Sequence, residues 1–211
     1  MVRAESLVAL GSLHRRPPRP VAPAGAGLKA AYARLVVNDE ETVLATLAHV
    51  LAAADSPAAA VGVDHREVTL VVVVPDPSVL PEEYPVTGIG GRVAVRPVSG
   101  ALAASWYRQL VAGHAVLAAR QAFAACPGID VGVLVVLRRR PGDEGAEVLL
   151  ATRLARSRLD RLHWAAVTAW DVVETVGDHT LCAVAGEVRA LAPLDLADQP
   201  ELADLVGVVR F

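Results

Sequence analysis

The sequence predicts an α/β domain built on a mixed central sheet. A helix, three strands, a long helix and further strands follow one another along the chain. Two strands, Val68–Val74 and Val131–Leu137, are apolar on both faces, which is typical of strands inside a covered sheet. Strands and helices do not alternate regularly, so a doubly wound nucleotide-binding fold or a barrel is disfavoured. An α+β arrangement remains the alternative.

The first helix of the folded body is expected over residues 39–54, where apolar side chains repeat at helical spacing. Asn38 can cap its free backbone amides, and Glu41, three residues later, can complete a capping box. Residues 29–37 either extend this helix or form a separate segment, and the pattern does not distinguish the two.

Three strands are expected next. Ala58–Val63 and Val68–Val74 flank four charged or polar residues at 64–67, which is typical of a β-hairpin. A third strand, Arg92–Arg96, follows the long connection Pro75–Gly91, which is rich in proline and glycine. These strands and the long helix after them give an αβββαβ-like core.

Ser99 is expected to cap the long helix, Gly100–Ala125, which would pack on the sheet. The helix is expected to carry one apolar stripe along its length, and Ala112 and Arg120 lie mostly off that stripe. The remaining expected elements are the strands Val131–Leu137 and Glu147–Leu154, a helix over Ala166–Val176, a C-terminal hairpin from His179–Val184 to Glu187–Leu191, and a last helix capped by Asp198.

The domain plan is a basic arm followed by one folded domain. Residues 1–27 are rich in Pro, Gly, Ala and Arg, so they are expected to be an extended, disordered arm. Residues 28–211 are expected to form a single α/β domain. The proline run Pro17–Pro23 is either a plain linker or a polyproline ligand for a partner.

Composition disfavours several classes of function. Arginine supplies 19 of the 20 basic residues, which with abundant Ala and Val points to a high-GC bacterial genome. Residues 1–30 hold five bases and one acid, so the body is more acidic than the net charge of −3 indicates. An acidic body argues against a protein that coats nucleic acid. No apolar stretch has the length of a membrane span, so we expect a cytoplasmic protein.

The two cysteines, Cys126 and Cys182, are too few for a disulfide scaffold or a four-cysteine zinc site. We expect two reduced, buried thiols. No constellation predicts a catalytic residue, a metal or a cofactor. The group Asp64–Glu67 contains candidate ligands, but it occupies an expected hairpin turn, where charged residues are ordinary.

Two surfaces are candidates for binding. The first is the connection Pro75–Gly91, because such a long loop is often functional in a compact domain. Its candidate contact residues are Asp76, Glu82, Glu83, Tyr84, Gly88, Gly90 and Gly91. The second is a basic patch formed by Arg138, Arg139, Arg140 and Arg153, which could contact phosphate.

The order of elements over residues 38–137 is similar to the core of the PD-(D/E)XK nuclease-like fold. The segment Tyr107-Arg108-Gln109-Leu110 resembles the glutamine-bearing helix of its RecB-like branch. That family holds Mg²⁺ with an acid on the second strand and an acid-x-Lys on the third. The third strand here, Arg92–Arg96, has no acid and no lysine. The resemblance therefore implies a fold without a catalytic set to transfer.

These observations favour a non-catalytic accessory or adaptor domain that acts through contacts with an unidentified protein partner. The high apolar fraction also leaves a homodimer open, because part of that surface could be buried between subunits. Two other functions remain alternatives: a divergent or inactive metal-dependent nuclease-like protein, and a small-ligand-binding domain with residues 75–91 as a lid.

Overall fold

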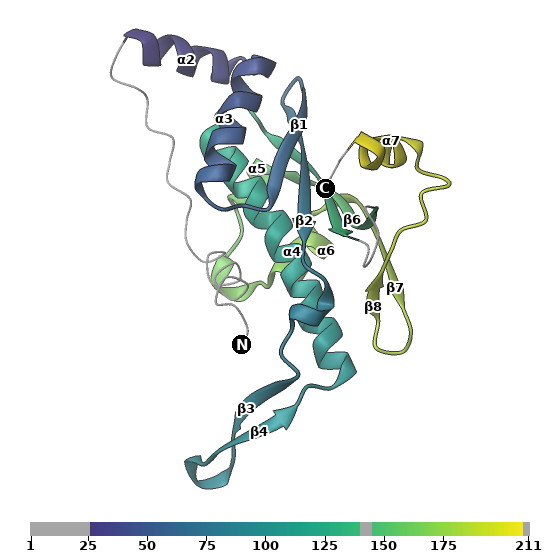
Figure 1. Cartoon of the computed structure of the whole chain (residues 1–211). Helices are drawn as coiled ribbons and strands as arrows, with labels where there is room; N and C mark the ends of the chain where they lie inside the picture. Colours follow the sequence, from purple (N-terminus) through teal and green to yellow (C-terminus); the bar gives the residue numbers. More distant parts are fainter. Residues whose placement is uncertain (1–25, 140–144, 209–211) are drawn as a thin grey trace.

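The fold is seen in a computed structural model that describes residues 26–139 and 145–208 (Figure 1). Almost the whole of the expected arm, residues 1–25, lies outside the described residues. The described chain begins with helix α2, Ala26–Val36, which is separate from helix α3, Glu40–Ala53. Residues 29–37 therefore belong mainly to a helix of their own and do not extend the next one.

The α/β fold with a mixed central sheet is confirmed. Six strands are ordered β1-β2-β5-β6-β7-β8, and β2 runs parallel to β5 while the other neighbours are antiparallel. The two strands with apolar side chains on both faces, β2 and β5, lie side by side inside the sheet. Their bounds are β1 Ala58–Asp64, β2 Glu67–Val74, β5 Val131–Arg139, β6 Ala146–Ala155, β7 Asp178–Ala185 and β8 Ala190–Ala192.

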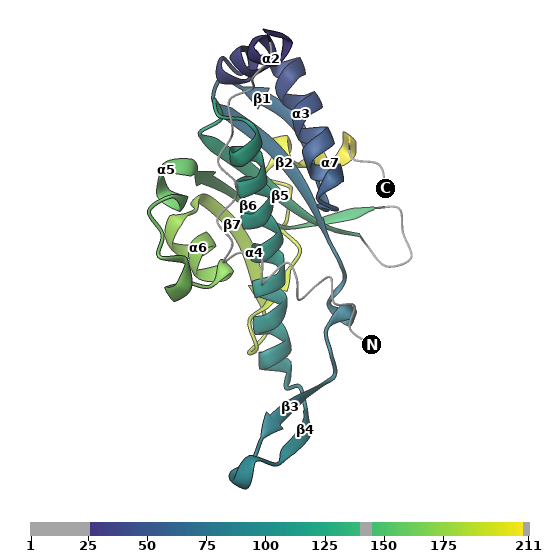
Figure 2. The same cartoon turned by 90° about the vertical axis from the view of Figure 1, so that its left-hand side faces the viewer.

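Helix α4, Gly100–Ala125, lies across one face of the sheet, with α3 and α6 beside it (Figure 2). The Ser99 side chain caps it as expected, accepting a hydrogen bond from the Leu102 amide at 3.2 Å. Ala112 and Arg120, expected off the apolar stripe, are both buried. The stripe is wider than expected because α4 contacts the sheet and also the helices on both sides of it.

The predicted start of α3 is one residue early. Asp39 is the capping residue, and its carboxylate accepts from the Thr42 amide at 3.1 Å. Asn38 instead adopts a left-handed conformation with φ 59° and donates from Nδ2 to the Gly128 carbonyl at 3.0 Å. Its side chain joins the turn before α3 to the loop after α4, which no local pattern in the sequence indicates.

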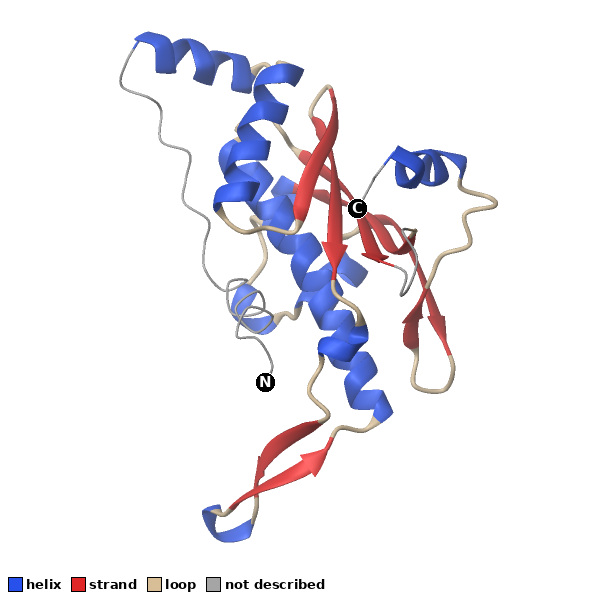
Figure 3. Cartoon of the chain, in the orientation of Figure 1, coloured by secondary structure: helices blue, strands red, loops and turns tan. Residues whose placement is uncertain are grey.

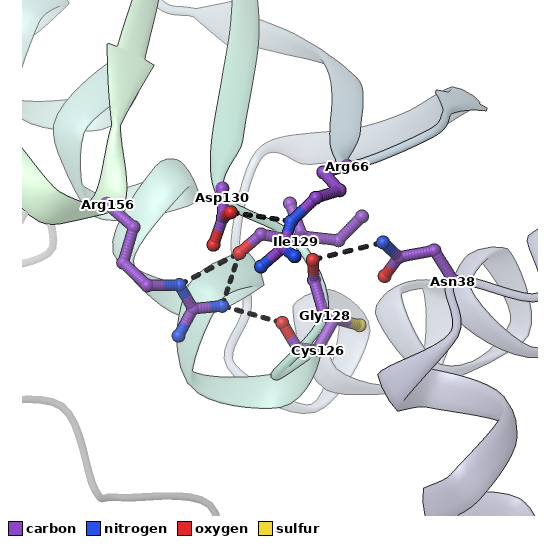
Figure 4. Close-up of polar contacts among 7 residues, drawn as sticks. All are labelled: Asn38, Arg66, Cys126, Gly128, Ile129, Asp130 and Arg156. Atoms are coloured by element: carbon purple, nitrogen blue, oxygen red, sulfur yellow. Dashed lines mark hydrogen bonds and ion pairs between the residues drawn. The ribbon is translucent and has the colours of Figure 1, made fainter.

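This joint continues into a network of backbone carbonyls held by Arg156 (Figure 4). The Arg156 guanidinium donates to the carbonyls of Ile129, at 2.8 Å from Nε, and Cys126, at 2.7 Å from Nη2. Arg66 pairs with Asp130 at 2.6 Å. The loop between α4 and β5 is thus fixed from three directions.

The C-terminal third covers parts of both faces of the sheet. A short helix α5, Arg156–Leu159, and a 3₁₀ turn at Trp164–Ala166 precede α6, Ala169–Val176. Helix α6 therefore begins three residues later than expected, with Thr168 and Asp171 forming its capping box. On the opposite face, residues 194–196 and helix α7, Pro200–Val208, pack on a second apolar cluster. The expected cap Asp198 lies two residues before α7.

The largest departure from expectation is the third strand. The segment expected as Arg92–Arg96 is strand β4, Val93–Pro97, and it pairs only with β3, Glu83–Thr87. The two form a separate antiparallel hairpin that projects away from the body beyond the start of α4 (Figures 1 and 3). We call residues Glu83–Pro97 the ribbon. Between β2 and the ribbon lies one 3₁₀ turn, Pro77–Val79.

Candidate protein-interaction surface

The ribbon is mounted on the first turns of α4. The Val98 amide donates to the Glu82 carbonyl at 2.8 Å, which closes the base of the ribbon. The ring of Tyr84 meets that of Trp106 edge to face, with centroids 5.8 Å apart and an interplanar angle of 86°. Ser99 begins α4 two residues after β4 ends. These contacts fix where the ribbon leaves the body.

The two faces of the ribbon differ. Cross-strand partners place Tyr84 with Arg96 and Val86 with Ala94 on one face, where Tyr84 and Val86 are partly buried. The other face carries Pro85 with Val95, Thr87 with Val93, and Glu83 with Pro97, and all six residues are exposed. Val93 is 70% exposed and Val95 62% exposed. This second face is predominantly apolar and has no covering element among the described residues.

The tip of the ribbon explains two of the candidate glycines. Gly90 and Gly91 have φ values of 80° and 75°, which only glycine adopts without strain. The Gly88 amide donates to the Arg92 carbonyl at 2.8 Å, closing the turn that contains the 3₁₀ segment Ile89–Gly91. The glycine-rich loop is therefore the turn of a hairpin, and it joins strand to strand.

Asp76 lies apart from the ribbon, just after β2. Its carboxylate accepts from the Ser78 amide at 3.0 Å and begins the turn at Pro77, and this hydrogen bond lowers the pKa of Asp76. Nearby, the Tyr107 hydroxyl donates to the Pro75 carbonyl at 2.9 Å. Burial raises the pKa of Tyr107 to about 12. These bonds hold the strand end from which the chain runs out to the ribbon.

The structure thus divides the expected loop site in two. Glu83, Tyr84, Gly88, Gly90 and Gly91 lie on the ribbon, and the exposed Glu82 stands at its base. Asp76 belongs to the body of the domain, at the carboxyl end of β2, where Arg138 lowers its pKa further.

The expected basic patch is not brought together. Arg138 and Arg153 lie on opposite faces of the sheet, as the alternation of their strands requires. Arg138 pairs with Glu147 at 2.6 Å with both side chains largely buried, and Arg153 pairs with Glu67. Arg139 ends β5, and Arg140 lies outside the described residues. Two of the four arginines are therefore neutralised within the fold.

Sequence reasoning missed Val93 and Val95, which form the exposed apolar face of the ribbon, and Trp106, which packs against Tyr84. The alternation Val93-Ala94-Val95 is visible in the sequence, but it fits a strand of the central sheet equally well. The useful signal is Pro85 and Pro97 within the two strands, because proline inside a strand indicates an edge or an isolated hairpin.

The other polar side chains considered for chemistry either make structural hydrogen bonds or do not gather into a site. The Gln109 amide donates to the Thr168 hydroxyl at 2.9 Å and accepts from the Trp170 amide at 3.1 Å, which ties α6 to α4. Burial lowers the pKa of His114. Over residues 26–139 and 145–208, no three His, Cys, Asp or Glu side chains gather to hold a metal ion.

The expectation of two buried thiols is half right. Cys126 is buried, and that burial raises its pKa to about 12. Cys182 is exposed and lies on β7, opposite Leu150 of β6. Both are free cysteines.

No family model, curated protein or solved structure matches this chain. The resemblance to the nuclease-like fold therefore rests on the sequence alone. Among the described residues, no helix combines the length and apolarity needed to cross a bilayer.

Proposed function

We propose that this chain is an accessory or adaptor domain that binds another protein through the ribbon. The observation that carries the proposal is the ribbon's apolar face, on which Val93 and Val95 are mostly exposed. Within the described part of the chain, the ribbon makes no extensive contact with the body beyond its base, so its sequence is not required to complete the core. A fixed, exposed and apolar appendage is typical of an interaction surface.

Energetics support the proposal. Burying a valine side chain completely is worth about 1.5–3 kcal/mol. Burial of both valines by the partner would therefore supply a large part of the free energy of a moderately tight complex. The ribbon is also held in place before binding, so little conformational entropy is lost when a partner covers it. The arginines of the body offer less, because Arg138 and Arg153 already have carboxylate partners.

The test is quantitative affinity capture of the tagged full chain from its native host, read by mass spectrometry. The informative variant is the double substitution Val93→Asp and Val95→Asp, which places two charges on the apolar face. The matched control is Val188→Asp, because Val188 is an exposed valine, 42% accessible, in the β7–β8 turn. We expect a near-stoichiometric partner for the wild type and control, and at least about a tenfold loss for the ribbon variant.

Three results would contradict the proposal. They are the absence of any stoichiometric partner, equal recovery with the ribbon variant, or equal loss with the control. Capture of only a second copy of the chain would show that the protein forms a homodimer and does not act as an adaptor. Mg²⁺-dependent cleavage of nucleic acid that Asp76→Ala abolishes would replace it by the nuclease-like alternative.

A further inference from the structure

We propose that the partner contributes an extended acidic-apolar segment that adds to the free edge of β4 as a third strand. This inference rests on the proposed function, since it describes how the ribbon would be recognised. It concerns the backbone edge of β4 as well as the apolar face.

The hydrogen-bond alternation of the ribbon identifies the groups on its edges. In an antiparallel pair, directly opposed residues alternate between bonded and non-bonded pairs. The contacts Val98 N to Glu82 O and Gly88 N to Arg92 O, each 2.8 Å, mark bonded pairs at both ends. The pairs Pro85–Val95 and Thr87–Val93 therefore fall on non-bonded sites, and their backbone groups point outward.

The two edges of the ribbon are consequently different. On β3 the central outward residue is Pro85, which has no N–H to offer. On β4 two successive outward residues, Val93 and Val95, both keep their N–H, and Pro97 closes the end of the strand. Only the β4 edge of the ribbon presents an uninterrupted set of donors and acceptors to an incoming strand.

The edges of the central sheet, by contrast, carry features that oppose strand addition. The outer strand β1 has an irregular register at Ala60–Gly62, and β8 has only three residues. On β7, His179 has a left-handed conformation with φ 51° next to an irregular register with β6. Such bulges and short strands are the usual means by which proteins protect sheet edges.

Side chains on β4 specify the chemistry of the incoming strand. Arg96 lies on the Ala94 face of β4, and Arg92, which is extended and hydrogen-bonded to Gly88 immediately before the strand, continues that face. Val93 and Val95 occupy the other face. Within the part of the chain that the structure describes, no carboxylate lies at ion-pair distance from Arg92 or Arg96. A complementary strand has acidic residues opposite the arginines and apolar residues opposite the valines.

A second copy of the chain fits this edge poorly in the two antiparallel registers that pair most of β4. Antiparallel pairing of two β4 strands about Ala94 would place Arg92 directly opposite Arg96, which like charge disfavours. Pairing about Val95 would instead place Val93 opposite Pro97, where a donor is missing. A different protein with an acidic-apolar strand satisfies both the charges and the backbone.

The test uses the ¹⁵N-labelled full chain and a synthetic probe, acetyl-Thr-Glu-Val-Ser-Val-Glu-Thr-amide. Its symmetric pattern presents glutamates and valines at the required spacing. We expect the largest amide shifts at Val93 and Val95. N-methylation of the two probe valines should weaken binding about tenfold or more, because it removes the donors that would face β4 in an antiparallel register.

Two substitutions test the edge and the charges separately. Val95→Pro removes one outward N–H opposite Pro85 and leaves the bonded pairs of the ribbon intact, whereas the control Val95→Thr keeps that N–H. We expect about tenfold weaker binding for Val95→Pro and less than about threefold for Val95→Thr. The pair Arg92→Glu and Arg96→Glu should reverse the preference, so that a probe with lysines in place of glutamates binds better.

Absence of binding, or shifts confined to other elements, would overturn the inference. Equal affinity of the N-methylated probe would overturn strand addition even if Val95→Pro failed to fold. If strand addition is overturned, the proposed function still stands provided that the Val93→Asp and Val95→Asp double variant loses the captured partner. Retention of that partner would instead show that the proposed function itself is wrong.

Discussion

Tyr107 is a single residue that fixes the strand end leading to the ribbon, and its titration makes this contact measurable. Its pKa of about 12 exceeds the ordinary value of 10.0, because burial favours the neutral hydroxyl. The contribution of the raised Tyr107 pKa to the free energy of unfolding is therefore fully present below pH 10, and it is lost as the pH rises towards 12. A shift of this size corresponds to at most about 3 kcal/mol.

We expect Tyr107→Phe to lower the free energy of unfolding by about 1 kcal/mol at neutral pH, through loss of the hydrogen bond to Pro75. The variant should also lose less stability than the wild type between pH 10 and 12. Urea titrations across this range measure both effects. Cys126 titrates in the same range in both proteins, so their difference reports Tyr107. Parallel pH curves would contradict the assignment.

Gly128 is required by close approach where the loop after α4 meets the end of α2. A Cβ there would lie 2.5 Å from the Val36 carbonyl and 2.7 Å from that of Leu35. We expect Gly128→Ala to destabilise the fold by about 1–3 kcal/mol in a denaturant titration. Gly62→Ala is the matched control, because no atom lies within 4 Å of its added Cβ and the unfolded chain loses entropy. Equal effects at both positions would refute this explanation.

Single residues are predictable where the chemistry is local. Ser99 caps its helix as expected because the capping hydrogen bond joins residues three apart. The capping role expected for Asn38 is wrong because its partner, Gly128, lies 90 residues away. Arg120 is buried although it is charged, and its guanidinium lies 4.4 Å from the centre of the Trp164 ring. Such distant partners leave no periodic trace in the sequence.

At the scale of elements, the ribbon is expected to behave as an appendage. The Glu82 carbonyl and Val98 amide are already bonded at its base, so an Asn-Gly turn can join these residues in place of Glu83–Pro97. Removing the ribbon abolishes the edge-to-face packing of Tyr84 on Trp106, which is worth about 0.5–1.5 kcal/mol. We therefore expect the free energy of unfolding to fall by about 1 kcal/mol.

Chemical denaturation of this ribbonless chain measures the cost. Leu134→Ala serves as the reference for a true core position, because Leu134 is fully buried and its truncation should cost about 2–5 kcal/mol. A ribbonless chain as unstable as that reference would show that the ribbon belongs to the core, which would remove the main support for its role in binding.

Most helices and strands could be predicted, since their periodicities and caps are local. The paired strands β1 and β2, the long helix α4 and the pair β5 and β6 lie close to their expected bounds. The expected place of β4 in the central sheet is wrong, because a five-residue alternating strand has the same pattern in a central sheet and in an isolated hairpin. Only its tertiary partners distinguish the two.

At the scale of the molecule, the mixed sheet follows from the sequence. Apolar side chains on both faces require β2 and β5 to be interior strands. In the structure the two strands pair directly and in parallel, and the ribbon and α4 form the connection between them along the chain. What the sequence does not show is which surface is left uncovered. Which surface stays uncovered depends on all the packing contacts of the folded chain. Those contacts leave the ribbon exposed, whereas Arg138 and Arg153 on the body are paired with carboxylates.

Hydrogen–deuterium exchange of the intact chain, alone and with its captured partner, tests most directly whether the partner binds the ribbon. We expect the partner to slow exchange across residues 83–97, most strongly at β4. Slowed exchange that is confined to other elements, with the ribbon unchanged, would show that the partner binds elsewhere and that the ribbon is not the binding surface.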